Sequence, residues 1–141
     1  MKKLFSNSIF IQTNQADLEQ LLLNTFELSK WNYAISSIEK IKPQTYVIQR
    51  NQPAVNQVEE VRVFKENGRV IYDSTGGRIE YRLEFSFLEN LGKIELRENF
   101  FVTSDTLIFP ETLFTPIIKH AFNQNLQALK RLTEQKNPTL R

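Results

Sequence analysis

Hydrophobic residues recur with helical spacing over one long stretch, Phe109–Gln135, close to the end of the sequence. At 100° per residue, one broad half of the helical wheel carries Ile117, Ile118, Ala121, Phe122, Leu126, Ala128, Leu129 and Leu132. Thr115 can cap this helix with Pro116 at its first position, or the helix can start at Pro110 and contain Pro116 as an interior break. From Thr115 to Gln135 the helix would be roughly 30 Å long, the length of a strand of about nine residues. It can therefore lie along a whole sheet.

Asn125 interrupts the apolar half of this helix, between Phe122 and Leu129 in angle. A buried amide needs hydrogen-bond partners, because an unpaired one costs about 1–3 kcal/mol. Two interpretations follow. Asn125 either bonds to a neighbouring strand or a water, or it faces an internal cavity.

Before this helix, the sequence predicts a strand and one or two helices, followed by a series of strands in which apolar and polar residues alternate. Leu4–Gln12 alternates as a strand, and Thr13 or Asn14 then caps a helix over Gln15–Phe26. Glu27–Ser36 is predicted as a second short helix or an irregular corner that places Trp31. The strands predicted after it are Ile35–Ile41 (bent or at an edge), Tyr46–Arg50, Val58–Lys65, Val70–Asp73, Ile79–Phe87 and Ile94–Val102. Asn67-Gly68 is a strong hairpin signal between two of them.

The last two predicted strands have the plainest alternation. One face of the first carries Ile79, Tyr81, Leu83, Phe85 and Phe87, and one face of the second carries Ile94, Leu96, Phe100 and Val102. Glu98 lies on that second apolar face. It points into the concave side of the sheet if the register holds, whereas a bulge near Asn99 would turn it outward.

This order of elements predicts an α+β fold in which residues 1–141 form a single domain. A strand-helix-helix start leads into a curved antiparallel sheet of six to seven strands, which wraps around the long C-terminal helix. Strands joined by short turns form a meander, and a sheet of this length must curl or close. The terminal helix is the element available to cover its concave face.

The opening strand leads into Thr13–Asn14, the helix Gln15–Phe26 is followed by Trp31, and a series of hairpins comes next. The later segment AFNQNLQALKRLTEQ contains Asn125, Leu126, Leu129, Lys130 and Glu134. In these features, and over essentially its whole length, the chain resembles the START-like, or SRPBCC, superfamily, many members of which have a similar Asn-Leu-x-x-Leu-Lys-x-x-x-Glu ending. The resemblance implies a helix-grip fold with a cavity between the sheet and the last helix. It assigns no subfamily, because members include lipid carriers, hormone receptors, aromatase/cyclase enzymes and chaperone activators.

The composition of the chain limits the kinds of molecule that it is expected to bind and the compartment in which it is expected to function. The net charge is +2, and the basic residues alternate with glutamates along the strands, which indicates a solvated face and no nucleic-acid binding. The chain has no cysteine, which fits a reducing compartment. It has neither a signal-peptide core nor a membrane-length apolar run, so we expect a cytoplasmic protein without a membrane span. Exposed edge strands would allow a homodimer.

Catalytic and metal motifs are weak. His120 is the only histidine and lies on the polar side of the helix, where a base has no positioned partner. One histidine without cysteines gives no metal site, and the Asp73–Gly77 segment is predicted as a hairpin turn because it lacks the lysine of a phosphate loop. We therefore assign no catalytic residue, metal or cofactor.

The remaining signal is an interior rich in aromatic residues, which include 11 phenylalanines. We predict a site for a small lipophilic or aromatic ligand, with Glu98 and Asn125 orienting a polar group. The other predicted lining residues are Trp31, Tyr81, Leu83, Phe85, Leu96, Phe100, Ile118, Phe122 and Leu129. Two alternatives stay open. One is a cyclase- or hydrolase-type enzyme with Glu98 as acid or base, and the other is a protein-interaction module whose core is filled.

Overall fold

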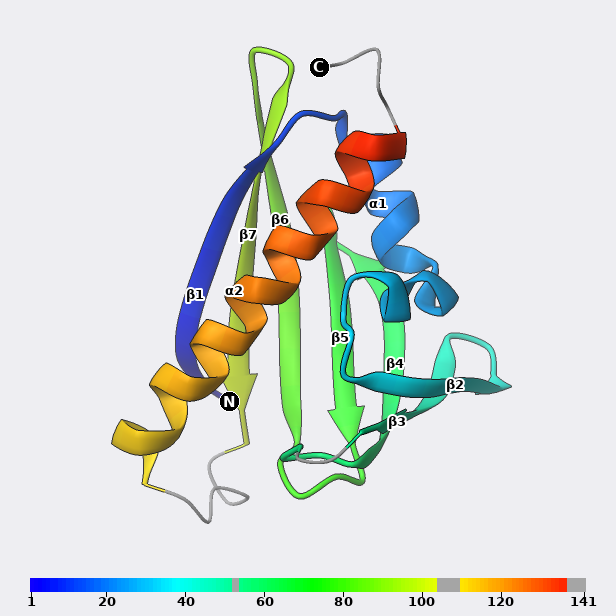
Figure 1. The fold of residues 1–141 in the computed structure, drawn as a ribbon, viewed down its shortest axis with the longest axis vertical. Coiled ribbons are helices and arrows are strands. Elements are labelled where there is room, and N and C mark those ends of the chain that lie inside the picture. The colour runs from blue at the N-terminus through cyan, green and yellow to red at the C-terminus, as the bar shows by residue number, and fades with distance from the viewer. Residues whose placement is uncertain (52–53, 104–109, 137–141) are drawn as a thin grey trace.

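A computed structural model describes residues 1–51, 54–103 and 110–136. In these residues, seven strands and three helical segments follow one another (Figure 1). In chain order they are β1 (Lys2–Ile11), α1 (Gln15–Leu23), the 3-10 helix η1 (Thr25–Lys30), β2 (Ile35–Lys42), β3 (Thr45–Arg50), β4 (Val58–Glu66), β5 (Arg69–Thr75), β6 (Tyr81–Asn90), β7 (Lys93–Val102) and α2 (Glu111–Lys136).

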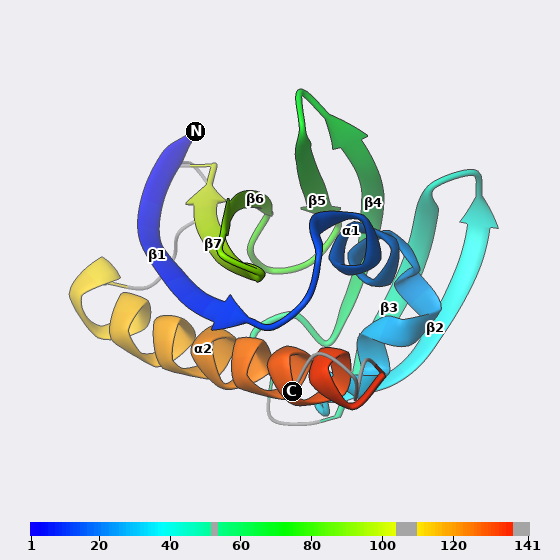
Figure 2. The same ribbon diagram turned by 90° about the horizontal axis from the view of Figure 1, so that it is seen from above.

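The strands form one antiparallel sheet in the order β1-β7-β6-β5-β4-β3-β2. Strands β2 to β7 are sequential neighbours, whereas β1 pairs with β7 at the opposite edge from β2. Seen from above, the sheet bends into an open curve and α2 lies across its concave side (Figure 2). The predicted α+β architecture, a curved sheet gripping a long helix, is confirmed. The predicted strand Ile35–Ile41 is the edge strand β2, whose pairing with β3 has two register shifts.

Two tight hairpins use left-handed backbone conformations. Asn67 and Gly68 have φ of 52° and 73°, as the predicted Asn-Gly turn between β4 and β5 requires. Leu91 and Gly92 have φ of 51° and 80° in the turn between β6 and β7. Leu91 therefore adopts a conformation that a residue with a Cβ rarely takes, and its side chain is 96% exposed.

The start of the chain differs from the prediction at one boundary. Asn14 caps α1 by accepting a hydrogen bond from the Asp17 amide at 2.9 Å, as predicted. However, α1 ends at Leu23 and not at Phe26, because the backbone of Asn24 is extended (φ −84°, ψ 90°). The following 3-10 helix takes the place of the predicted second short helix or corner. It brings Trp31 into the core, where the side chain is buried.

Helix α2 begins at Glu111, so the prediction that Thr115 caps it is wrong and the earlier start is correct. Pro116 lies inside the helix. The Pro110 carbonyl accepts hydrogen bonds from the amides of Leu113 and Phe114 at 3.1 and 3.0 Å, which closes the first turn. Phe114 is buried at this end, and its packing offsets the hydrogen bond that a proline at position 116 cannot donate.

One flank of α2 is attached to β1 along most of the length of the helix. Lys2 pairs with Glu111 at 2.8 Å, the Asn7 side chain donates to the Lys119 carbonyl at 3.1 Å, and Lys130 donates to the Phe10 carbonyl at 2.7 Å. Near the end of the helix, Glu134 accepts from the Gln12 amide at 3.0 Å. The other flank of α2 faces the ends of β3 and β6 and the segment before β4. Within the described ranges, α2 included, no helix has the length and apolar character needed to cross a membrane.

Candidate functional site

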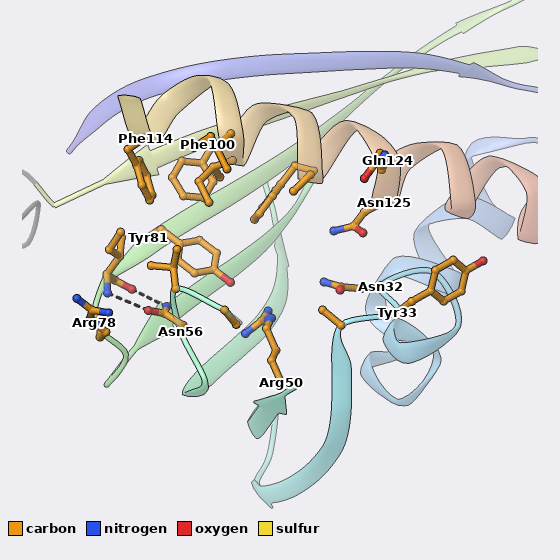
Figure 3. A pocket seen from close by; sticks show the side chains of 18 of the residues that line it. Asn32, Tyr33, Arg50, Asn56, Arg78, Tyr81, Phe100, Phe114, Gln124 and Asn125 are labelled. Atoms are coloured by element: carbon orange, nitrogen blue, oxygen red, sulfur yellow. Dashed lines mark hydrogen bonds between the residues drawn. The ribbon is translucent and has the colours of Figure 1, made fainter. Parts of the chain in front are cut away.

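An open cavity of about 1020 Å³ lies between α2 and the ends of the strands opposite it (Figure 3). One wall comes from α2, with apolar side chains facing inward and Gln124 and Asn125 beside them. The other wall comes from the connection between η1 and β2, the end of β3, the segment before β4, the β5–β6 connection, the start of β6 and Phe100 of β7. A volume of this size is at the upper end of the range for small-molecule pockets.

Four aromatic rings in mutual contact, which we call the aromatic cluster, are Phe5, Tyr81, Phe100 and Phe122. Tyr81, Phe100 and Phe122 line the inner floor of the cavity, and Phe5 lies behind Phe100. Phe100 lies between Phe5 and Tyr81 in parallel stacks with centroids 4.8 and 5.0 Å away. Phe122 of α2 meets the Phe100 ring edge-on at 5.3 Å. The strand register causes this arrangement, because Phe5 is the cross-strand partner of Phe100 and Tyr81 is diagonal to it on β6.

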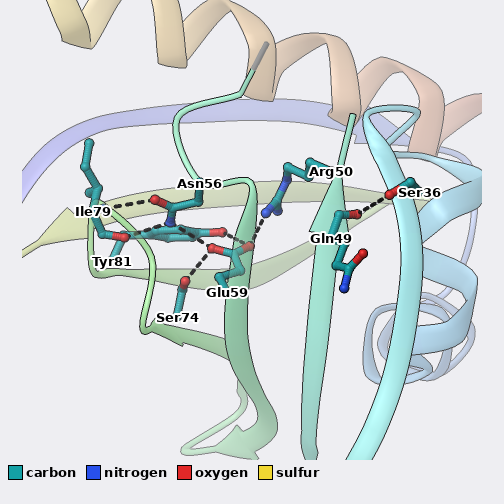
Figure 4. A network of polar contacts seen from close by, with 8 residues as sticks. All are labelled: Ser36, Gln49, Arg50, Asn56, Glu59, Ser74, Ile79 and Tyr81. Atoms are coloured by element: carbon teal, nitrogen blue, oxygen red, sulfur yellow. Dashed lines mark hydrogen bonds and ion pairs between the residues drawn. The ribbon is translucent and has the colours of Figure 1, made fainter. Parts of the chain in front are cut away.

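The buried carboxylate of Glu59 connects the segments that form the cavity wall next to the aromatic cluster (Figure 4). Glu59 accepts hydrogen bonds from Arg50, Ser74, Asn56 Nδ2 (2.9 Å) and Tyr81 Oη (2.9 Å), and we call these five residues the Glu59 network. Burial, followed by the nearby Glu59 carboxylate, raises the pKa of Tyr81 well above its ordinary value, so its hydroxyl stays a donor. Four donors satisfy the buried charge of Glu59.

Asn56 also fixes the loop that connects β5 and β6. Its side chain accepts from the Ile79 amide at 2.9 Å and donates to the Ile79 carbonyl at 2.7 Å. Gly77 lies so close that a Cβ there would come within 2.4 Å of Asn56 Cγ. A side chain at position 77 would therefore displace Asn56, which holds the adjoining segment of the cavity wall.

Glu98 points inward, which was one of the two orientations predicted. Strand β7 keeps its register with both neighbours at this position, opposite Phe85 on β6 and Asn7 on β1, so there is no bulge at Asn99. Glu98 is 1% exposed, and its Oε1 atom has no hydrogen-bond partner among the described residues. Burial raises the pKa of Glu98 to about 8, against a smaller opposing effect of a hydrogen bond from Asn7.

Glu98 and Trp31 line a second, much smaller cavity of about 20 Å³, the inner chamber. This volume holds about one water-sized group. The inner chamber and the main cavity share Asn32, Arg50, Tyr81, Phe122 and Asn125 as lining residues, so they adjoin along a common wall. The Trp31 Nε1 atom is buried without a hydrogen-bond partner in the described part of the chain.

The structure divides the sequence-predicted site residues into three groups. Phe100 and Ile118 line the main cavity, and Tyr81, Phe122 and Asn125 line both spaces. Trp31, Leu83 and Glu98 line the inner chamber only. Phe85, Leu96 and Leu129 line neither, because they are fully buried in the core, where the Phe85 ring meets Trp31 and Tyr72 edge-on. His120 is exposed on α2, as its place on the wheel predicts.

The sequence analysis did not predict several residues that line the two cavities. For two of them, the position on a strand face could have indicated a buried charge. Arg50 continues the face of Tyr46 and Ile48, and Glu59 shares a face with Val61 and Val63, so both charges fall on a buried strand face. Asn56 and Arg78 lie outside the strands, where periodicity gives no signal. No cluster of three His, Cys, Asp or Glu side chains that could hold a metal is found in residues 1–51, 54–103 and 110–136.

Comparisons with known proteins find similarity in structure but not in sequence. No protein-family model and no curated protein sequence matches the chain. A START superfamily protein from Mycobacterium smegmatis is similar over 94% of this chain and 98% of its own, with a TM-score of 0.80 and 13% identity. TTHA0849 from Thermus thermophilus is similar over 94% and 97%, with a TM-score of 0.74 and 14% identity. A conserved protein from Geobacillus kaustophilus is similar over 92% and 94%, with a TM-score of 0.72 and 13% identity.

Proposed function

We propose that this chain, which has the fold found in the START superfamily, binds a small and mostly apolar molecule between α2 and the sheet. The observation that carries the proposal is the open cavity of about 1020 Å³ with its floor of aromatic rings. Concave, largely apolar spaces with a few placed polar groups are the usual form of small-molecule sites.

The exposed apolar residues of α2 support an apolar ligand. Ile117 and Ala121 face the cavity and are both exposed, Ile117 at 68%. An apolar molecule in the cavity would remove this surface from water, which is favourable by about 25 cal/mol per Å². The Glu59 carboxylate lines the inner chamber and not the main cavity. It already has four donors, so that buried charge does not need a polar ligand to satisfy it.

The test combines ligand identification with a variant that obstructs the cavity. Native mass spectrometry of protein purified from its own source should show a co-purifying molecule, and a lipid and aromatic library should give saturable, displaceable binding. Ala121→Phe places a ring in the cavity and should weaken that binding. His120→Phe is the matched control, because His120 is the exposed neighbour on α2 that does not line the cavity. The absence of displaceable binding across the library would refute the proposal.

A second candidate function is acid–base catalysis by Glu98 in a cyclase- or hydrolase-type reaction. The observation that favours it is the position of this carboxyl beside the cavity, with burial raising its pKa to about 8, near the pH at which a general acid works well. Glu98→Gln should then abolish turnover of a bound substrate while leaving its binding in place. A Glu98 that titrates at its ordinary pKa by NMR would rule out this function.

A further inference from the structure

The inner chamber contains two buried polar atoms that the protein leaves without partners. Trp31 Nε1 and Glu98 Oε1 both belong to side chains that line the inner chamber, and each residue is at most 3% exposed. Neither atom has a hydrogen-bond partner within the described residues. Buried polar atoms are paired in the great majority of cases, so two orphans on one small space point to a group that binds between them.

The main cavity lies directly next to this space. The wall between the two is made by residues that line both, including Phe122 and Asn125 from α2 and Tyr81 from β6. The inner chamber therefore adjoins the main cavity on the side of β7, where Glu98 lines it. A short polar substituent on an apolar body would extend into it.

The residues that line the inner chamber determine which chemical group of a ligand can bind there. Trp31 Nε1–H is a donor only, so the group must accept a hydrogen bond. A volume of about 20 Å³ has room for about one water-sized group, which excludes a carboxylate or a phosphate. Arg50 and Glu59 also line the chamber but pair with each other, so the third condition is a partner for the Glu98 Oε1 atom, which has none among the described residues. A hydroxyl meets all three conditions, because it accepts from Trp31 and pairs with Glu98 Oε1 whether or not Glu98 is protonated.

We propose that the inner chamber binds a hydroxyl group of an otherwise apolar ligand, with Trp31 as hydrogen-bond donor and Glu98 as the second partner. This inference rests on the proposed function. A single water molecule would offer the same hydrogen bonds, so the experiment must separate a ligand hydroxyl from a water.

Three matched probes make that separation: 2-naphthol, naphthalene and 2-methoxynaphthalene. They share the aromatic body, but only 2-naphthol has a hydroxyl, and the methoxy group is too large for the chamber. Trp31 is the only tryptophan, so the indole N–H gives one resonance in a ¹H–¹⁵N spectrum. Binding of 2-naphthol should move this resonance downfield, while the other two probes should bind in the main cavity with the indole resonance nearly unchanged.

Affinities of the same probes give a second measurement. The preference for 2-naphthol over naphthalene should fall about 3- to 10-fold in Glu98→Leu, the effect of losing one net hydrogen bond. Glu98→Gln should keep most of the preference, since its amide can still pair with a hydroxyl. Ile118→Ala, which changes only the main cavity wall, should weaken all three probes together and leave the preference unchanged.

The two proposals fail in different ways. Wild-type protein that binds 2-naphthol with an unmoved indole resonance, and with the same preference in Glu98→Leu, would show that the chamber holds water only and would overturn this inference alone. Wild-type protein that binds none of the three probes, nor any member of the broader library, would overturn the proposed function and this inference with it.

Discussion

Replacing Glu98 with glutamine should remove a pH-dependent part of the stability of this fold. Burial raises the pKa of Glu98 to about 8, from an ordinary value of 4.5. Between these two values the folded protein keeps a proton that the unfolded chain releases. The free energy of unfolding therefore falls as pH rises through this window, and the effect is complete above the folded pKa.

The size of the effect follows from the two pKa values. At about 1.36 kcal/mol per pKa unit, the difference between 4.5 and about 8 corresponds to about 5 kcal/mol. Small domains have unfolding free energies of about 5–15 kcal/mol, so the ionisation of Glu98 would cost a large share of the total. Glutamine has a similar shape and cannot ionise. The stability of Glu98→Gln relative to wild type should rise by about 1.4 kcal/mol per pH unit between pH 5 and 8, and then level off.

Urea denaturation of both proteins at pH 5, 6, 7, 8 and 9 measures this difference. The comparison between variant and wild type at each pH cancels the titration of groups that both proteins share. A difference that does not change with pH would refute the reasoning, as would a Glu98 carboxyl that titrates near 4.5 in a ¹³C NMR experiment on the folded protein.

Three further substitutions test other parts of the structure by urea denaturation. Leu91→Gly should raise the free energy of unfolding by about 1 kcal/mol, because it relieves the left-handed backbone at an exposed turn position, and an unchanged midpoint would contradict that strain. Gly77→Ala should destabilise the protein by about 1–3 kcal/mol, because the added Cβ displaces Asn56 from its hydrogen bonds, and a neutral result would show that the loop adjusts freely. Glu59→Gln should cost about 3–5 kcal/mol, because it leaves the Arg50 guanidinium without its counter-charge, and a loss below about 1 kcal/mol would mean that solvent replaces the carboxylate.

The architecture could be predicted because local signals and the final fold agree. The predicted strand Ile79–Phe87 corresponds to β6, although β6 begins only at Tyr81, and the Asn67-Gly68 pair forms the tight turn that its residue types favour. The alternation of the next predicted strand placed Glu98 on an apolar face, and the unbroken register of β7 keeps it there. Where a periodic pattern is long and no tertiary contact opposes it, the sequence alone predicts the element and the face on which each side chain lies.

The start of α2 could not be predicted because local preference and tertiary contacts disagree there. Pro116 favours a helix that begins at Thr115, yet Phe114 is buried and Glu111 pairs with Lys2, so the first turn is stabilised from outside the helix. The Glu59 network has a similar origin. Asn56 reaches Ile79 across 23 residues, a contact that no periodicity encodes.

The attachment of α2 to β1 has a consequence for the speed of folding. The contacts that hold the helix on this strand join residues 109 to 122 positions apart in the chain. Contacts between such distant segments require large loops to close, and proteins dominated by them fold in milliseconds to seconds, more slowly than those with local contacts. The main cavity, which has α2 as one wall, therefore forms only when these distant segments have met.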